Sequence, residues 1–241
     1  MSYFESRLKV DFNNFEEIEK TLRFCEDLGL KNIILESKNE NFKFTSDLKS
    51  KIGKRSKINV YYRTSLRPKS LRDFKLKISQ YSNSNEILSV ETFDKQIQIQ
   101  AAKDSRVDII SYSLFDILKT ISPGVISLTK QNNSFIEFSL APIMTENETI
   151  QSKNLRRLYR GVQMAMNLRA NYIINGNFEN MYDFRHPRGL ISVCNTLLGM
   201  PIQKAKKAFS HSVELLIKKV ENRKDDKIIE TGVELLKKGV K

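Results

Sequence analysis

Residues 32–63, NIILESKNENFKFTSDLKSKIGKRSKINVYYR, contain the pattern that decides the fold. The run 32–36 is short, apolar and rich in isoleucine, which is typical of a buried strand. Residues 45–54 then follow a helical pattern, and the β-branched and aromatic run 58–63 predicts a second strand. A strand, a helix and a strand in this order form the unit from which parallel sheets are built.

The same alternation continues in both directions along the chain. Residues 6–10 predict a first strand, and Asn13 or Asn14 caps a helix that ends at Gly29. Further elements are predicted as strands at 87–90, 107–111, 124–128, 135–139 and 172–175, and as helices at 70–80, 94–103, about 154–169, and after Pro187. Eight strands in one chain suit a closed barrel better than an open sheet. We therefore predict one TIM-like α/β barrel over residues 1–224, followed by a helical tail over 225–241.

Positive charge is concentrated in two parts of the chain, which has a net charge of +13. Residues 49–77 hold eleven basic residues and a single acid, Asp73, and residues 149–178 contain no acid at all. Like charges repel one another in water, and a polyanion offsets that repulsion. A membrane surface usually recruits a basic amphipathic helix, whereas residues 49–77 mix helical and strand-like pieces. A nucleic-acid partner is therefore favoured.

The sequence also predicts the cellular compartment in which the protein acts. No apolar run reaches the ~18 residues that a membrane-spanning helix needs, and the first residues predict no secretion signal. Cys25 and Cys194 stand alone in helical patterns, where buried core thiols are the expected assignment. A cytoplasmic protein with no membrane association is predicted.

Residues suited to catalysis are scarce. His186 and His211 are the only histidines, and neither belongs to a metal-binding pair. The first strand offers Ser6-Arg7-Leu8 where a barrel phosphoesterase would place paired histidines, and no glycine-rich phosphate loop is present. The sequence predicts a chain that binds rather than catalyses, with no metal or cofactor of its own.

Two segments are more constrained than folding requires. The first is AAKDSRVDII at residues 101–110, where Arg106 and Asp108 alternate on a strand that is otherwise apolar. They form either an internal ion pair, or a site in which Arg106 offers its planar guanidinium to a phosphate. In the second segment, DFRHPRGL at 183–190, a helix starting at Pro187 would gather Arg185, His186 and Arg188 at its positive end.

These two segments, followed by Leu198-Gly199-Met200 and Ala205, resemble the archaeal ribonuclease P protein component 3 family, the counterpart of a thirty-kilodalton eukaryotic subunit. The likeness covers about residues 3–223. It implies a barrel of the polymerase-and-histidinol-phosphatase type without a metal site. It also implies a non-catalytic subunit that binds and stabilises a catalytic RNA, and this RNA removes 5′ leaders from precursor tRNA with its own Mg²⁺.

The resemblance further implies assembly with a small ferredoxin-like protein subunit as a heterotetramer. Arg106 and Arg188 match family motif positions that suit RNA contacts, and Arg63 and Arg67 match by strand order. Arg185, beside Arg188, completes the predicted RNA-binding set. Two alternatives stay open from the sequence: a metal-dependent barrel phosphoesterase, and a structural barrel that binds only a protein partner.

Overall fold

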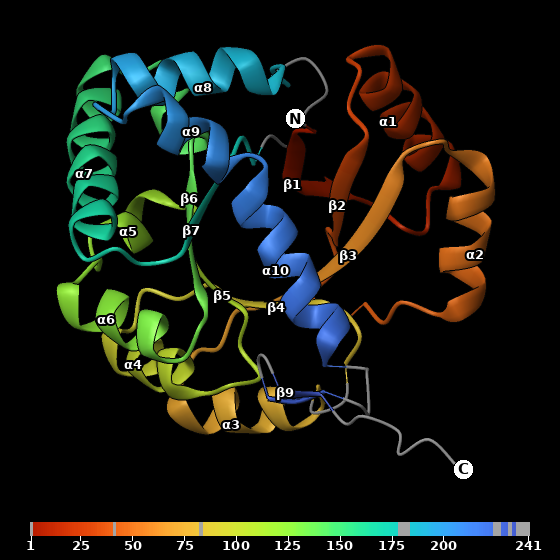
Figure 1. The fold of residues 1–241 in the computed structure, drawn as a ribbon, viewed down its shortest axis with the longest axis horizontal. Coiled ribbons are helices and arrows are strands. Elements are labelled where there is room, and N and C mark those ends of the chain that lie inside the picture. Colours follow the sequence, from red (N-terminus) through yellow and green to blue (C-terminus); the bar gives the residue numbers. More distant parts are fainter. Residues whose placement is uncertain are drawn as a thin grey trace, which may run out of the picture.

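Seven parallel strands curl into a nearly closed barrel in the computed structural model, with helices packed around the outside (Figure 1). The structure describes residues 2–40, 42–81, 84–177 and 184–223, together with the backbone of 228–230 and 233–234. The strands pair in sequence order and are β1 (Phe4–Val10), β2 (Asn32–Ser37), β3 (Asn59–Leu66), β4 (Ile87–Val90), β5 (Ile109–Tyr112), β6 (Phe135–Ser139) and β7 (Tyr172–Asn175). This arrangement confirms the predicted TIM-like α/β barrel.

Helices connect the strands, and polar side chains cap most of their N-termini. Asn14 caps the first helix by accepting a hydrogen bond from the Glu17 N–H, and Thr45 and Ser70 act in the same way on the next two. The helices are α1 (Phe15–Asp27), α2 (Ser46–Arg55), α3 (Leu71–Ser79), α4 (Lys95–Lys103), α5 (Phe115–Leu118), α6 (Pro123–Gln131), α7 (Glu148–Asn167), α8 (Pro187–Thr196), α9 (Ile202–Ala208) and α10 (His211–Asn222), with a 3-10 turn at Ala141–Ile143.

The predicted strand at 124–128 is wrong, because these residues lie inside helix α6. Ser122 accepts a hydrogen bond from the Val125 N–H, and Pro123 occupies the first turn, where its missing N–H costs nothing. The β-branched residues then bury one helical face, formed by Val125, Ile126 and Thr129. The barrel therefore has seven strands where the sequence predicted eight.

The predicted helical tail also differs where it is described. Ile228–Glu230 and Val233–Glu234 form two short antiparallel strands, β8 and β9. The rest of the tail, at 225–227, 231–232 and 235–241, lies outside the described residues, as does residue 224, so the boundary at residue 224 stays a prediction.

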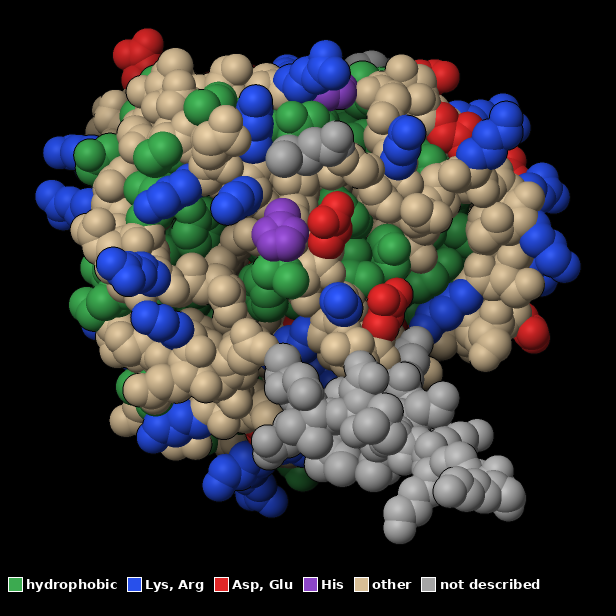
Figure 2. Space-filling view, in the orientation of Figure 1, with side chains coloured by type: hydrophobic (Ala, Val, Ile, Leu, Met, Phe, Trp, Pro, Cys, Tyr) green, Lys and Arg blue, Asp and Glu red, His purple; other side chains and the backbone are tan. Residues whose placement is uncertain are grey.

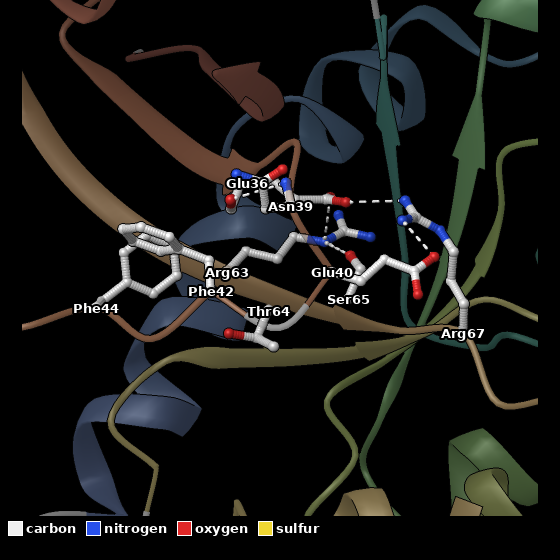
Figure 3. A pocket seen from close by; sticks show the side chains of 10 residues that line it. Glu36, Asn39, Glu40, Phe42, Phe44, Arg63, Thr64, Ser65 and Arg67 are labelled. Atoms are coloured by element: carbon white, nitrogen blue, oxygen red, sulfur yellow. Dashed lines mark hydrogen bonds and ion pairs between the residues drawn. The ribbon is translucent and has the colours of Figure 1, made fainter. Parts of the chain in front are cut away.

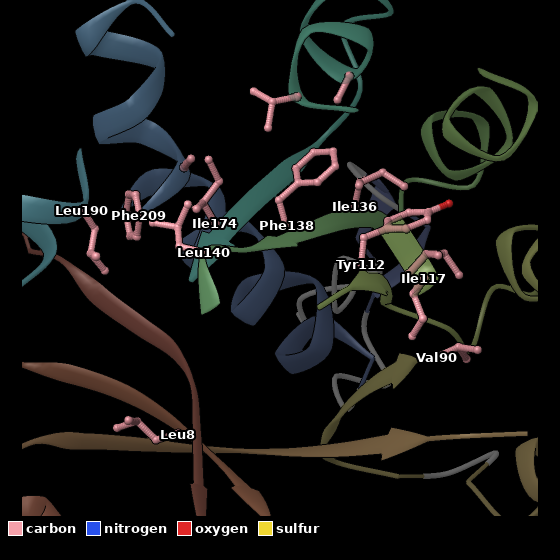
Figure 4. Packing of buried hydrophobic residues seen from close by; sticks show 14 of the residues in the cluster. Leu8, Val90, Tyr112, Ile117, Ile136, Phe138, Leu140, Ile174, Leu190 and Phe209 are labelled. Carbon is pink, nitrogen blue, oxygen red and sulfur yellow. The ribbon is translucent and has the colours of Figure 1, made fainter. Parts of the chain in front are cut away.

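Apolar residues form two cores separated by the sheet. The larger core lies between the sheet and the outer helices, where Tyr112, Phe138 and Ile174 point away from the barrel interior (Figure 4). The smaller core fills the N-terminal half of the barrel with one residue from each of six strands, namely Phe4, Ile34, Ile87, Ile109, Phe135 and Ile173. Helix α10 crosses this end and covers it with Val213, Leu216, Ile217 and Val220 (Figure 1).

No helix in the described ranges is both long and apolar enough to span a membrane.

Candidate functional site

A layer of charged side chains fills the C-terminal half of the barrel. Because strand side chains alternate, the residue two positions after each apolar interior residue faces inward again. This rule places Glu36 after Ile34, and Glu137 after Phe135, inside the barrel. In β1 the register shifts between Glu5 and Leu8, and such a bulge re-aims a side chain. The full layer comprises Arg7, Glu36, Arg63, Ser89, Glu91, Ser111, Glu137 and Asn175, all buried.

Two arginines organise this layer. The Arg7 guanidinium donates to Glu36, with Nε 2.7 Å from Oε2, and to Glu91, with Nη1 3.1 Å from Oε1. The Arg63 guanidinium donates to both oxygens of Glu137, and its Nη2 lies 2.6 Å from Oε2. Paired, two-point contacts of this kind are the strongest hydrogen bonds that a carboxylate can accept from an arginine.

Arg63 therefore does not occupy the position predicted for an RNA contact. Its side chain has no exposed surface, and carboxylates of the barrel interior engage its guanidinium. Arg67 lies four residues after Arg63, just past the C-terminal end of β3. Its side chain is 29% exposed and pairs with Glu36, Glu40 and Glu91. Figure 3 shows Glu36 joined to both arginines and Glu40 joined to Arg67.

The electrostatics of the layer follow from burial and these pairings. Burial alone would raise the pKa of Glu91, but Arg7 and Arg67 outweigh burial and lower this pKa to about 2. The Glu5 carboxyl has no such cation, and burial raises its pKa to about 8, although it accepts hydrogen bonds from the Arg7 and Gly176 backbone N–H groups. Glu5 also bridges β1 to the residue after β7, where the barrel comes nearest to closing.

The carboxylates of the barrel do not form a metal site. Glu36, Glu91 and Glu137 converge, but guanidinium groups of Arg7 and Arg63 occupy the space between them. Within the described ranges, no cluster of three or more His, Cys, Asp or Glu could hold a metal ion. The recess above the layer, lined by Glu36, Arg63 and Arg67, has a volume of about 10 Å³, which is room for one water molecule.

Many charges of the 49–77 block have acidic partners within the protein. Lys49 pairs with Glu86, Arg55 with Glu19, and Lys77 with Asp73, in addition to the pairs of Arg63 and Arg67. Five of its eleven cations are therefore neutralised within the protein. The sequence alone overestimated how much free charge this block presents.

A basic face on α7, α8 and α9 contains no acidic residue of its own in the described ranges. In residues 149–177 and 184–213, the described part of this region, the charged residues are all basic: Lys153, Arg156, Arg157, Arg160, Arg169, Arg185, Arg188, Lys204, Lys206 and Lys207. Lys153, Arg156 and Arg160 project from α7 and form no ion pair with any described carboxylate. Figure 2 shows Lys and Arg side chains over these helices, with hydrophobic side chains between them. We call this surface the α7–α9 face.

Helix α8 starts at Pro187, as the sequence predicted. Pro187 occupies the first turn, and His186 caps the helix, with its Nδ1 accepting a hydrogen bond from the Arg188 N–H at 3.0 Å. Arg185 and Arg188 are both exposed beside it. Asp183 of the same motif lies outside the described residues.

The other motif is arranged differently from the predicted ion pair. Arg106 pairs with Asp104 across a tight turn, with Nε 2.9 Å from Oδ1 and Nη2 2.7 Å from Oδ2. Asp108 is buried and accepts instead from α10, where Arg223 Nη2 lies 2.5 Å and Lys219 Nζ 3.5 Å from its Oδ1. The Arg106 side chain remains about one-third exposed.

The two thiols are core groups, as predicted. Cys25 and Cys194 are buried and unbonded, and burial raises the pKa of each to about 12. A thiol with so high a pKa is a poor nucleophile at neutral pH.

Sequence reasoning missed the charged interior. Arg7, Glu91 and Glu137 were not singled out, although a charged residue at an inward position of an apolar strand was a usable signal. In the strand FIEFS, Glu137 stands where the alternation places an inward side chain.

Comparison with known proteins agrees with the fold and the motifs. The sequence profile of the RNase P subunit p30 family matches residues 7–225, and no curated protein sequence matches. The structure is similar to a chain of the cryo-EM structure of archaeal ribonuclease P with mature tRNA, with a TM-score of 0.81 and 17% identity over 99% of this chain and 100% of that chain.

Two further solved structures are similar with lower TM-scores. Ochratoxinase of A. niger has a TM-score of 0.63 and 9% identity, over 90% of this chain and 71% of that one. A mutant organophosphorus hydrolase from Deinococcus radiodurans has a TM-score of 0.55 and 8% identity, over 89% and 92% of the two chains. At these identities the likenesses show the shared fold, whereas the profile match spans most of the chain. The chain belongs to the RNase P subunit p30 family.

Proposed function

We propose that this protein subunit of RNase P works by holding RNA on the α7–α9 face, while its barrel interior serves to stabilise the fold. The observation that carries this proposal is that three exposed cations on α7, Lys153, Arg156 and Arg160, form no ion pair with any described carboxylate. Each phosphate that a cation neutralises releases counterions, and this release is the main source of affinity that does not depend on sequence.

The barrel interior supports a non-catalytic role. Its carboxylates are engaged by Arg7 and Arg63, and the recess above them has a volume of only about 10 Å³. Hydrolysis then falls to the partner RNA with its own Mg²⁺, and this chain requires no cofactor. The metal-dependent phosphoesterase alternative finds no suitable set of donors among the described residues.

Reconstitution with the RNase P RNA tests this function. At low Mg²⁺, removal of the 5′ leader from a precursor tRNA should be strongly reduced when this chain is omitted. Replacing Arg156 and Arg160 together by Gln should reproduce part of that loss. Cleavage that is unchanged without the protein would contradict the proposal. The matched control is Lys51→Gln, which removes an exposed charge from the 49–77 block.

We also propose a small ferredoxin-like protein subunit as partner, in a heterotetramer. Family membership supports this partner, and an exposed apolar group offers a place for it. Phe93, Leu114 and Met144 follow β4, β5 and β6 at the same end of the barrel and are 72%, 50% and 44% exposed. Phe93→Ser with Leu114→Ser should abolish co-elution with the small subunit and leave the melting temperature unchanged. Co-elution that persists would place the interface elsewhere.

A further inference from the structure

A surface cavity of about 380 Å³ lies at the N-terminal end of β1 and β2, next to the start of α8. Tyr3 precedes β1, Gly29 and Lys31 lie in the turn between α1 and β2, and His186 and Arg188 come from the start of α8. In Figure 1 the N-terminus lies between α1 and α8. Three segments that are distant in sequence therefore build one cavity, in the size range of about 300–1,000 Å³ that is typical of small-ligand sites.

The residues that line this cavity combine rings with positive charge. Tyr3 and His186 are both partly exposed, so each ring offers surface to a ligand. Lys31 and Arg188 are exposed and form no ion pair with a carboxylate of the described ranges. Both cations therefore remain available to an anion from outside.

His186 is held in a defined orientation. Its Nδ1 accepts the Arg188 backbone N–H at 3.0 Å, so Nε2 is the nitrogen that carries a proton and can donate a hydrogen bond. Gly29 has a φ of +72°, a backbone conformation that favours glycine. The space where a side chain would start at this position is open, because no atom lies within 4 Å of it. Only backbone therefore forms this part of the cavity wall. The described lining residues of the cavity present two rings, a fixed donor and two cations, and none of them is a carboxylate.

We propose that this cavity takes one unpaired nucleotide of the RNA partner, with its base against Tyr3 and His186 and its phosphates against Lys31 and Arg188. The proposal rests on the proposed RNA-binding function and adds the kind of RNA that is bound. Unstacked bases are recognised by stacking on aromatic rings, whereas a base inside a duplex has no free face. The cavity adjoins the α7–α9 face through α8, so a strand that crosses this face can place a base in it.

Fluorescence anisotropy with the full chain can test the proposal, using a labelled single-stranded oligouridylate and a short blunt-ended RNA duplex as probes. Tyr3→Leu removes one ring, and His186→Asn removes the other while keeping a side-chain oxygen that can cap α8. Each variant should weaken binding of the single strand by about fivefold or more and leave duplex binding within about twofold of wild type. The control Lys204→Gln, on α9, should weaken both probes alike.

Three outcomes would overturn the nucleotide assignment. The variants could bind the single strand as wild type does, or lose both probes equally, or keep all RNA binding but lose association with a protein partner, which would indicate an acidic peptide. Failure of wild-type protein to bind either probe would instead contradict the proposed function.

A second measurement does not depend on how the variants fold. A 4-thiouridine oligonucleotide, cross-linked by light to the wild-type chain, should attach within the peptides that contain Tyr3 or His186. Cross-links confined to other peptides would overturn the assignment.

A further variant serves as a control for the anisotropy measurement. Tyr3→Phe keeps the ring and should bind the single strand as wild type does.

Discussion

Arg63 and Glu137 form a two-point ion pair inside the barrel, and neither side chain has exposed surface. The two residues are 74 positions apart and come from β3 and β6. The pair therefore ties together strands that are not neighbours in the sheet, through the interior that they enclose. Arg63 thus forms an internal ion pair, whereas the sequence had suggested that it contacts RNA.

Breaking this pair should destabilise the fold strongly. Arg63→Ala leaves the Glu137 charge buried without its main partner, which costs about 3–5 kcal/mol of unfolding free energy. Urea denaturation measures this loss. Arg55→Ala, which breaks the exposed pair with Glu19, should cost less than about 1 kcal/mol. Arg63→Ala protein that is as stable as wild type but weak in RNA binding would return Arg63 to the RNA surface.

Glu5 should make stability fall as pH rises from about 5 to 8. Its folded-state pKa of about 8 lies above the ordinary value of 4.5, because burial disfavours the carboxylate. Between these values the folded protein binds a proton that the unfolded chain has lost, so the contribution of Glu5 to stability is greatest below pH 4.5 and declines until about pH 8.

The variant Glu5→Gln resembles the protonated form and should remove this slope. It should gain about 3 kcal/mol over wild type at pH 7 and nothing near pH 4. Urea denaturation at several pH values gives the comparison. Glu16→Gln, at an exposed carboxyl whose pKa is lowered by a hydrogen bond from Lys20, should leave the slope between pH 5 and 8 unchanged. Parallel profiles for wild type and Glu5→Gln would refute the assignment.

The salt dependence of RNA affinity should locate the binding face. Each phosphate contact contributes roughly −0.7 to −0.9 to the slope of log K against log salt. Arg156→Gln and Arg160→Gln should each reduce the magnitude of this slope by roughly 1, without loss of melting temperature. Lys51→Gln is the control and should change neither quantity. A larger change for Lys51→Gln than for the α7 variants would place the RNA on the 49–77 block.

Arg106→Ala should weaken RNA binding and cost little stability. The pair with Asp104 is partly exposed and spans only two residues, so its loss should cost less than about 1 kcal/mol. Affinity measured beside a thermal melt separates the two effects. Arg188→Ala, at the start of α8, is expected to behave alike. A fall in melting temperature that accounts for the lost binding would assign Arg106 a structural role.

Local patterns determined the architecture from the sequence alone. The alternation of strand and helix signals predicted all seven barrel strands within a few residues of their observed positions. Pro187 and His186 marked the start of α8 in the same way. These features depend on capping and side-chain periodicity, which act between residues a few positions apart. The strand prediction at residues 124–128 was wrong because their β-branched run also fits one helical face. Ser122 and Pro123 favour the helix.

Tertiary structure decided where the charges of this protein act. Arg63 and Arg156 are both arginines in acid-poor stretches, and neither has a carboxylate nearby in the sequence. The carboxylate that neutralises Arg63 comes from a strand 74 positions away, whereas no described carboxylate reaches Arg156. Ion pairing depends on distances of a few ångströms between side chains that only the closed barrel brings together. The sequence thus determined a basic α/β barrel, and its closure determined which cations remain free for RNA.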